Sequence, residues 1–165
     1  MYDLIRGRAE GLRERMAGFA SGLIRIPSVS LDEGKAAEAV EKEMLALGYD
    51  KVFRDGNGNV AGIIFGREAK PVLLLCSHLD TVSPEGKAWT KGAYSGAAEG
   101  GRIYGAGASD CKGGTAAQIY AGALLKKSLL PFRGTLVVAA TVAEENGRSV
   151  GLRGLLSGTL PGMGC

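Results

Sequence analysis

The chain has 165 residues, of which 45% are hydrophobic and 22% are charged, and its formal net charge is +3. This length and apolar fraction are typical of one soluble globular domain with a single sizeable core. Lys and Arg residues are scattered among acids rather than gathered in a basic stripe, so we expect no nucleic-acid partner. No apolar run approaches the about 20 residues that span a bilayer, and the N-terminus lacks the apolar stretch of a signal peptide. We therefore expect no membrane association and a cytoplasmic protein.

Two helices are predicted at the start of the chain. Apolar residues between Leu4 and Ile26 recur at helical spacing and stop at Pro27, which indicates an amphipathic helix. A second helical pattern runs from Asp32 to Leu47 and stops at Gly48, a residue that suits the end of a helix.

Strands and a third helix are predicted next. Short strands over residues 51–54 and 59–65 flank an Asp-Gly-Asn-Gly turn, and the apolar run 71–77 is typical of a strand buried on both faces. A helix over residues 112–130 and a buried strand over residues 135–143 follow. The alternation of strand and helix predicts an α/β domain in which helices cover a central sheet and a site lies at the carboxyl ends of its strands.

His78 and Asp80 form the first polar cluster at such a strand end. Side chains two residues apart on a strand point to the same side, so a histidine ligand and a carboxylate that orients its ring would lie together. The alternative is a lone histidine at a strand end that makes only a local hydrogen bond, and for an isolated histidine this is the more common case. A Ser-His-Asp hydrolase using Ser77 or Ser109 is disfavoured, because the chain contains no G-x-S-x-G elbow.

Asp110 lies in the second cluster, a glycine-rich loop from Tyr104 to Gly114 that precedes a predicted helix. The loop lacks the third glycine of a dinucleotide-binding motif and the G-K-[ST] of a phosphate-binding loop, and a carboxylate would repel phosphate. A carboxylate held there suits a cation, and one Asp can bridge two metal ions. An ordinary helix N-cap remains the alternative.

Glu144 and Glu145 form the third cluster, directly after the apolar strand 135–143. Adjacent acids repel each other unless cations or hydrogen bonds offset the cost. One of the two could bind a metal while the other handles a proton, as metal-assisted hydrolysis requires. A solvated surface pair is the alternative, and it fits less well after so apolar a strand.

Together the three clusters resemble the motifs of the M20 metallopeptidases. The resemblance lies in the runs Leu73 to Val82 and Gly100 to Gly114, in Trp89 between them, and in the Glu144-Glu145-Asn-Gly segment. That family includes acetylornithine deacetylase, succinyl-diaminopimelate desuccinylase, aminoacylase and carboxypeptidase relatives. It implies a three-layer, zinc-exopeptidase-like α/β catalytic domain with a mixed, largely parallel central sheet.

The resemblance also implies a role for each cluster residue. His78, Asp110 and Glu145 would bind two Zn²⁺ ions, or Co²⁺ or Mn²⁺ in their place, with Asp110 as the bridge and Asp80 supporting His78. A zinc-bound hydroxide would hydrolyse an amide, with Glu144 as general base, in a peptide or N-acyl amino acid. By the same resemblance the bond between Asp110 and Cys111 would be cis. Relatives carry various residues at the position of Cys111, so its thiolate could be a ligand, but we favour a side chain that turns away from the metals.

One departure from the family concerns the ligand count. The chain has a single histidine, and residues 148–165 contain no acid, so each zinc would lack one protein ligand. We therefore interpret residues 1–165 as the N-terminal part of a truncated catalytic domain, without the lid and dimerisation domain of a possibly homodimeric parent. This chain would hold the metals partly or not at all and be inactive alone. The alternative is a non-catalytic short paralogue or fragment that acts as a binding or self-association module.

Overall fold

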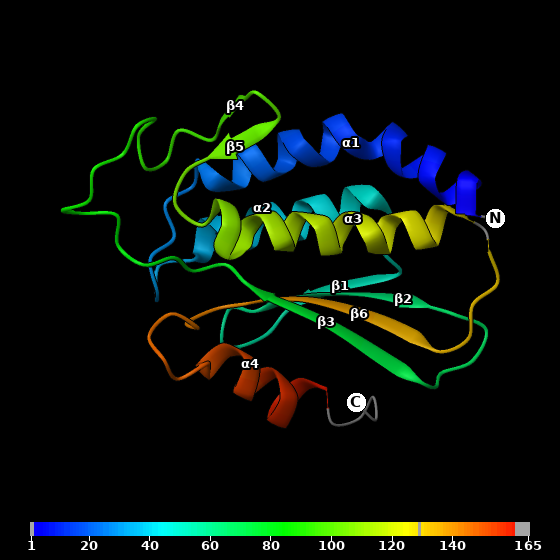
Figure 1. Ribbon diagram of the computed structural model, residues 1–165. Coiled ribbons are helices and arrows are strands. Elements are labelled where there is room, and N and C mark those ends of the chain that lie inside the picture. Colours follow the sequence, from blue (N-terminus) through cyan, green and yellow to red (C-terminus); the bar gives the residue numbers. More distant parts are fainter. Residues whose placement is uncertain (1, 129, 161–165) are drawn as a thin grey trace.

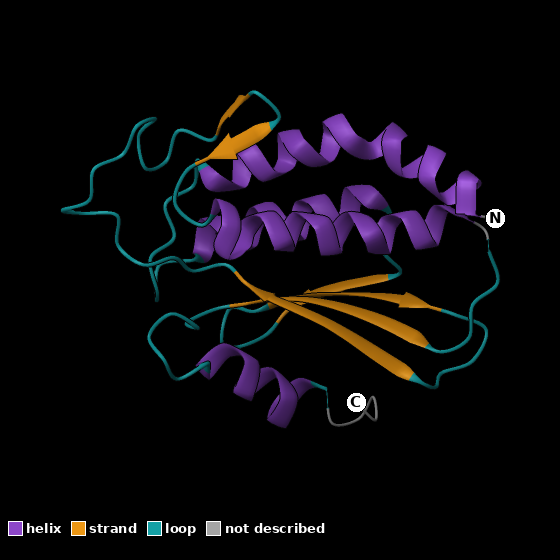
Figure 2. Cartoon of the chain, in the orientation of Figure 1, coloured by secondary structure: helices purple, strands orange, loops and turns teal. Residues whose placement is uncertain are grey.

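The computed structural model describes residues 2–128 and 130–160, which form three layers (Figure 1). Three helices lie over one face of a four-stranded sheet, and a short helix lies under the other. Figure 2 shows that long loops gather at one end of the sheet, where β3 and β6 finish. In chain order the elements are α1 (Tyr2–Ile24), α2 (Gly34–Leu47), β1 (Lys51–Arg54), β2 (Val60–Phe65), β3 (Val72–His78), β4 (Ala97–Glu99), β5 (Arg102–Tyr104), α3 (Gly113–Ser128), β6 (Thr135–Thr141) and α4 (Val150–Gly154).

The central sheet has the strand order β1-β2-β6-β3. β6 pairs with β3 in parallel and with β2 antiparallel, and β1 pairs with β2 antiparallel. The expectation of an α/β fold with a mixed sheet is confirmed, but the larger share of pairings among the described strands is antiparallel. The reason is that β1 and β2 form a hairpin, which adds two antiparallel pairings beside the single parallel one.

The predicted elements occur with small shifts at their ends. The first helix ends at Ile24 rather than Ile26, and the third begins at Gly113 and ends at Ser128. Leu129, which the third predicted helix included, lies outside the described residues. The small hairpin β4–β5 and helix α4 were not predicted, because neither segment is long enough to show a clear period.

The core explains why β6 lies at the centre of the sheet. All seven residues of β6 are buried. Its alternate side chains serve two apolar clusters on opposite faces, with Leu136 and Val138 toward the helices and Val137 and Ala139 toward the segment after α4. A strand buried on both faces carries apolar residues at every position, as the sequence of β6 does.

Two glycines allow Tyr49 to pack inside the helix–sheet interface. A Cβ at Gly62 would lie 2.6 Å from Tyr49 Cδ1, and a Cβ at Gly122 would lie 2.2 Å from the Tyr49 hydroxyl oxygen. That hydroxyl donates a hydrogen bond to the backbone oxygen of Ile119 at 2.8 Å. Glycine at both positions therefore leaves space for an aromatic ring that joins β2 to α3.

Candidate metal centre

The carboxyl ends of β3 and β6 bring the first and third sequence clusters together. His78 is the last residue of β3 and pairs in parallel register with Thr141, the last residue of β6. Asp80, which follows two residues after the end of β3, therefore lies beside the turn that contains Glu144 and Glu145. His78 and Asp80 are 8% and 0% exposed, so the Asp80 side chain is fully shielded from bulk water and His78 keeps only a small exposed edge.

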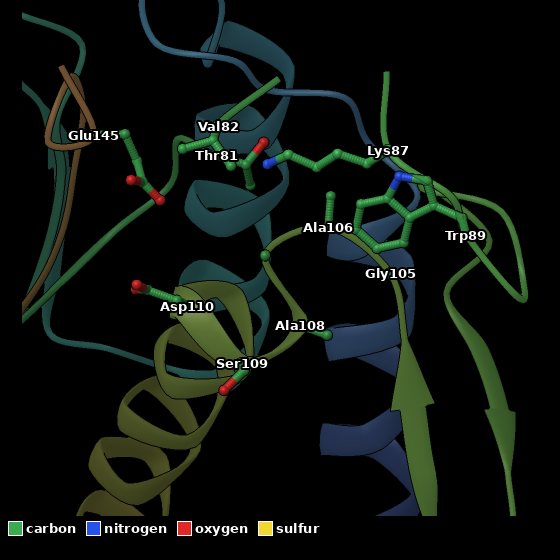
Figure 3. Close-up of a pocket in the computed structure, with 11 residues that line it drawn as sticks. Thr81, Val82, Lys87, Trp89, Gly105, Ala106, Ala108, Ser109, Asp110 and Glu145 are labelled. Atoms are coloured by element: carbon green, nitrogen blue, oxygen red, sulfur yellow. The ribbon is translucent and has the colours of Figure 1, made fainter. Parts of the chain in front are cut away.

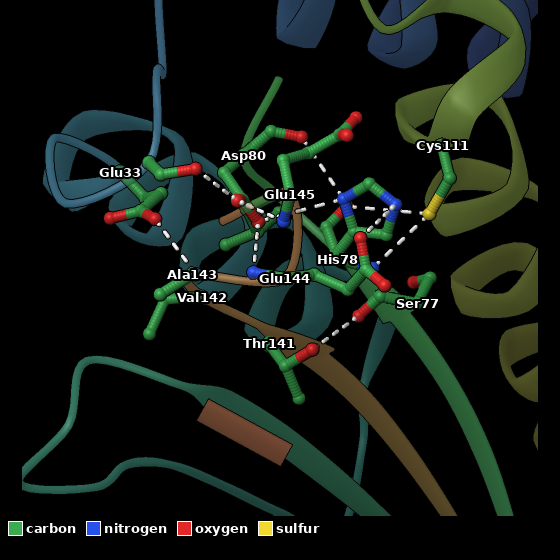
Figure 4. A network of polar contacts seen from close by, with 12 residues as sticks. Glu33, Ser77, His78, Asp80, Cys111, Thr141, Val142, Ala143, Glu144 and Glu145 are labelled. Carbon is green, nitrogen blue, oxygen red and sulfur yellow. Dashed lines mark hydrogen bonds and ion pairs between the residues drawn. The ribbon is translucent and has the colours of Figure 1, made fainter. Parts of the chain in front are cut away.

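Asp80 accepts several of the hydrogen bonds that hold this site together (Figure 4). Its Oδ1 accepts a hydrogen bond from the amide of Glu144 at 3.1 Å, and its Oδ2 accepts one from the amide of Glu145 at 2.9 Å. The hydroxyl of Ser30 donates to Oδ2 at 2.6 Å. Burial by itself would raise the pKa of Asp80, but His78, Ser30 and the two amides outweigh it and hold that pKa well below its ordinary value. Asp80 is therefore an ionised carboxylate that fixes the 144–145 backbone.

His78 has its two ring nitrogens in different surroundings. Nδ1 lies 3.0 Å from the backbone oxygen of Asp80 and 3.5 Å from its Oδ1. Nε2 lies 3.0 Å from Asp110 Oδ1 and 3.8 Å from Glu144 Oε2. Asp80, then Cys111 and Asp110, raise the pKa of His78 to about 11 in the metal-free chain. A proton on Nδ1 would leave Nε2 free as a ligand, which is how carboxylates commonly orient a metal-binding histidine.

The loop before α3 places Asp110 next to His78. It turns at Gly107, whose φ is 77° and where a Cβ would lie 2.6 Å from Thr81 Cγ2. The peptide bond between Asp110 and Cys111 is cis, as the resemblance implied. Lys112 then points inward, completely buried, and donates hydrogen bonds to the backbone oxygens of Leu23 at 3.1 Å and Ile26 at 2.6 Å. Burial lowers the pKa of Lys112 to about 8. These two hydrogen bonds of Lys112 thus connect the loop to the end of α1.

Cys111 lies closer to the candidate ligands than the favoured interpretation predicted, and nearer to the alternative in which its thiolate is a ligand. Its Sγ lies in a group with ligand atoms of His78 and Asp110, all within 4.8 Å of one another. The amide of His78 donates to this sulfur at 3.1 Å. The thiol therefore contacts the His78 backbone beside the candidate ligands.

Glu33, which the sequence did not single out, sets the shape of the acidic turn. It is 5% exposed, and its Oε1 accepts hydrogen bonds from the amides of Leu31 and Ala143, each at 2.9 Å. Ala143 has a φ of 55°, a conformation that L-residues rarely adopt. An acid at the start of a helix is common, so Glu33 carries no signal in the sequence that separates it from an ordinary first-turn acid.

Glu144 and Glu145 diverge from the fixed turn. Glu144 has its side chain 46% exposed and faces His78. Glu145 lines the same pocket as Asp110. Burial raises the pKa of Glu145, and the carboxylates of Asp110, Glu144 and Asp80 add to this, although His78 opposes them. The five residues predicted from the sequence therefore lie around one site.

The donor set fits a divalent transition metal. One imidazole, several carboxylates and a thiol converge, and within residues 2–128 and 130–160 the His78 ring is the only basic side chain in contact with these acids. Imidazole nitrogen, carboxylate oxygen and thiolate sulfur are the ligands that zinc takes in proteins. A cation would also offset the repulsion between the acids.

A pocket of about 360 Å³ opens beside these acids (Figure 3). Asp110 and Glu145 line one side, and Lys87 and Trp89 line the other. Gly105 to Ala108, the first part of the glycine-rich loop, forms the floor between them.

No helix among the described residues is both long and apolar enough to cross a membrane.

The fold is a three-layer α/β domain with a candidate metal site at one end of its sheet, and comparison with known proteins gives the family. Residues 74–163 match the model of peptidase family M20/M25/M40, and the chain belongs to this family.

Two curated relatives and one solved structure illustrate the similarity. The chain is 35% identical over 146 residues to the uncharacterized protein YgeY of Escherichia coli K12, covering 88% of this chain and 36% of that protein. It is 34% identical over 137 residues to a succinyl-diaminopimelate desuccinylase of Gluconacetobacter diazotrophicus, covering 80% and 35%. An M20 family metallo-carboxypeptidase of Sulfolobus solfataricus superposes with a TM-score of 0.67 at 26% identity, covering 83% of this chain and 32% of that one. The chain thus spans about a third of the length of these relatives.

Proposed function

We propose that this chain carries half of the metal site and the general base of an enzyme that hydrolyses amide bonds. The observation that carries the proposal is the convergence of His78, Asp110, Glu144 and Glu145 at the ends of the parallel strands β3 and β6. Family membership supports it, as do the desuccinylase and metallo-carboxypeptidase relatives, whose names describe cleavage of acyl or peptide amides. The substrate class is therefore a peptide or an N-acyl amino acid.

We propose a role for each ligand, and the geometry supports it. His78 would bind through Nε2, since Nδ1 faces Asp80, and Asp110 would share its carboxylate between two ions. Glu145 would bind the second ion from the other side of the pocket. Zinc, or Co²⁺ or Mn²⁺ in its place, would supply a Lewis acid that polarises the substrate carbonyl and lowers the pKa of water.

Glu144 is the proposed general base. Its side chain is half exposed, faces His78 and stands on a backbone that Asp80 holds, so it can reach a water and a substrate together. It would take the proton from the attacking water and pass it to the leaving nitrogen. Asp80 would act through His78 and through the 144–145 backbone rather than on the substrate.

The metal ligands in this chain are fewer than a catalytic site usually keeps. The chain has one histidine, and the assigned set leaves each ion one protein ligand short of three. We propose that residues 1–165 correspond to the N-terminal part of the relatives' catalytic domain and that this chain alone is inactive. The remaining ligands, the lid and the dimerisation domain would lie in the part of the relatives that this chain does not cover.

The experiment is Glu144→Gln in the complete gene product, with Glu68→Gln as the matched control. Glu68 is exposed and pairs with Arg133 at the other end of the sheet. Glu144→Gln should leave zinc content unchanged and lower turnover of N-acyl amino acids or dipeptides by about 10²–10⁴-fold, the usual contribution of a general base. The Glu68→Gln variant should match the wild type. Undiminished turnover in Glu144→Gln would overturn the base assignment, and a gene product that binds no metal would favour a non-catalytic module.

A further inference from the structure

Lys87 is a cation that the proposed chemistry does not use. It lines the pocket beside Asp110 and Glu145, and Figure 3 shows its side chain extended across the pocket toward Thr81 and Val82. Among residues 2–128 and 130–160 no ion pair of Lys87 is found. Lys91, four residues on, is by contrast paired with Glu99 and lies over the ring of Tyr104. The positive charge of Lys87 is therefore available to a ligand that enters the pocket.

Trp89 gives the same side of the pocket a rigid apolar wall. Its Nε1 donates a hydrogen bond to the backbone oxygen of Pro84 at 3.2 Å, and the amide of Lys87 donates to that oxygen at 3.3 Å. Both residues are thus held on one closed loop. The indole is 39% exposed and Val82 is 50% exposed, so part of the pocket wall near Lys87 is apolar. An ammonium beside apolar walls attracts an anion more strongly than one in open water.

The two sides of the pocket differ in charge. Asp110 and Glu145 lie on the side where amide cleavage is proposed, and the metals proposed there would offset their negative charge. The Lys87 side chain starts on the other side, and its ammonium group points toward Thr81 and Val82, where it can attract an anion. A substrate that fills the pocket would place its amide near the acids and their metals and a negative group at the ammonium of Lys87. This arrangement fits a short substrate with a carboxylate close to the scissile amide.

We propose that Lys87 is a specificity-determining residue that binds a carboxylate of the substrate, beside the apolar wall that Trp89 forms. The inference rests on the proposed amide hydrolysis and deepens it. The carboxylate could belong to the acyl side, as in a dicarboxylic monoamide, or to the amino acid on the other side of the bond. Both sources present the same group to Lys87.

Binding can be measured without turnover, because Trp89 is the only tryptophan of the 165-residue chain. Its fluorescence reports directly on the pocket during titration with succinamate or with butyramide, a neutral amide of similar size. Succinamate should bind about tenfold more tightly, the low end of a charge-assisted hydrogen bond. Lys87→Met should remove the preference, Lys87→Arg should keep most of it, and Lys91→Met should leave it unchanged. Equal binding of both amides, or a preference that survives in Lys87→Met, would overturn the inference.

Turnover by the zinc-loaded complete gene product separates the two sources of the carboxylate. N-succinyl-alanine is compared with N-butanoyl-alanine, and each with its alaninamide counterpart, by kcat/KM in wild type and Lys87→Met. Loss of the succinyl-over-butanoyl preference assigns Lys87 to the acyl side. Loss of the alanine-over-alaninamide preference assigns it to the other side. If Lys87→Met changes neither ratio, the inference fails while amide hydrolysis stands; if no amide is cleaved but Trp89 still reports Lys87-dependent succinamate binding, amide hydrolysis fails and the carboxylate site stands.

Discussion

Replacing Asp80 by Asn tests whether one buried carboxylate holds the acidic turn. Both oxygens of Asp80 are occupied: Oδ1 by the amide of Glu144, and Oδ2 by the amide of Glu145 and the hydroxyl of Ser30. An Asn side chain has one acceptor oxygen and one NH₂ donor. In either orientation the NH₂ group faces one of the two backbone amides, so at least one hydrogen bond is lost.

The cost follows from the burial of Asp80. Its side chain is 0% exposed, so water does not replace the missing acceptor. Removing a buried partner in this way costs about 1–3 kcal/mol, and we expect a loss of about 2 kcal/mol in the free energy of unfolding. Looser support of His78 and of the 144–145 backbone should also weaken zinc binding by about 10–100-fold, as changes beside metal ligands usually do.

Two measurements on the same variants test this reasoning. Urea unfolding in the presence of a chelator gives the stability difference, and titration with zinc gives the affinity. The control is Asp32→Asn, because Asp32 is an exposed acid that should change stability by no more than about 0.5 kcal/mol. An Asp80→Asn variant as stable as Asp32→Asn, with wild-type zinc affinity, would refute the role of Asp80 as the acceptor that fixes the turn.

Two further predictions concern the core and the surface. Gly122→Ala should lower the free energy of unfolding by about 1–3 kcal/mol, because its Cβ would meet the Tyr49 hydroxyl at 2.2 Å; Tyr49→Phe should recover part of this loss in a double-mutant cycle, and strictly additive costs would contradict the contact. Burial raises the pKa of Asp50, but Lys126 and the amide of Phe65 outweigh it and lower that pKa. Asp50 therefore stabilises the fold above its unfolded pKa of about 4 and loses this effect as the pH falls. Asp50→Asn should cost less than about 1 kcal/mol at pH 7 in low salt, since the pair is partly exposed, and acid unfolding should show the difference disappear as the pH falls through the lowered pKa of Asp50.

The strand ends that carry the site were predictable because their signal is local. The apolar runs before His78 and Glu144 are long, nearly uncharged and bounded by polar residues, so each indicates a buried strand and its end. The glycine-rich loop similarly indicates a turn before a helix, which places Asp110. In the structure these three segments do lie at one end of the sheet.

The sequence by itself therefore determined the α/β character and the five candidate residues, since both depend on residue type and spacing along the chain. The order of strands, the antiparallel pairing of β2 with β6, and the partners of Asp80 were decided only by tertiary structure. Glu33, Cys111 and Lys112 show why: each acts through backbone groups from a distant part of the chain, namely Ala143, His78 and the end of α1. A hydrogen bond to the backbone depends on where that backbone lies and not on the side chain it carries, so it leaves no pattern in the sequence.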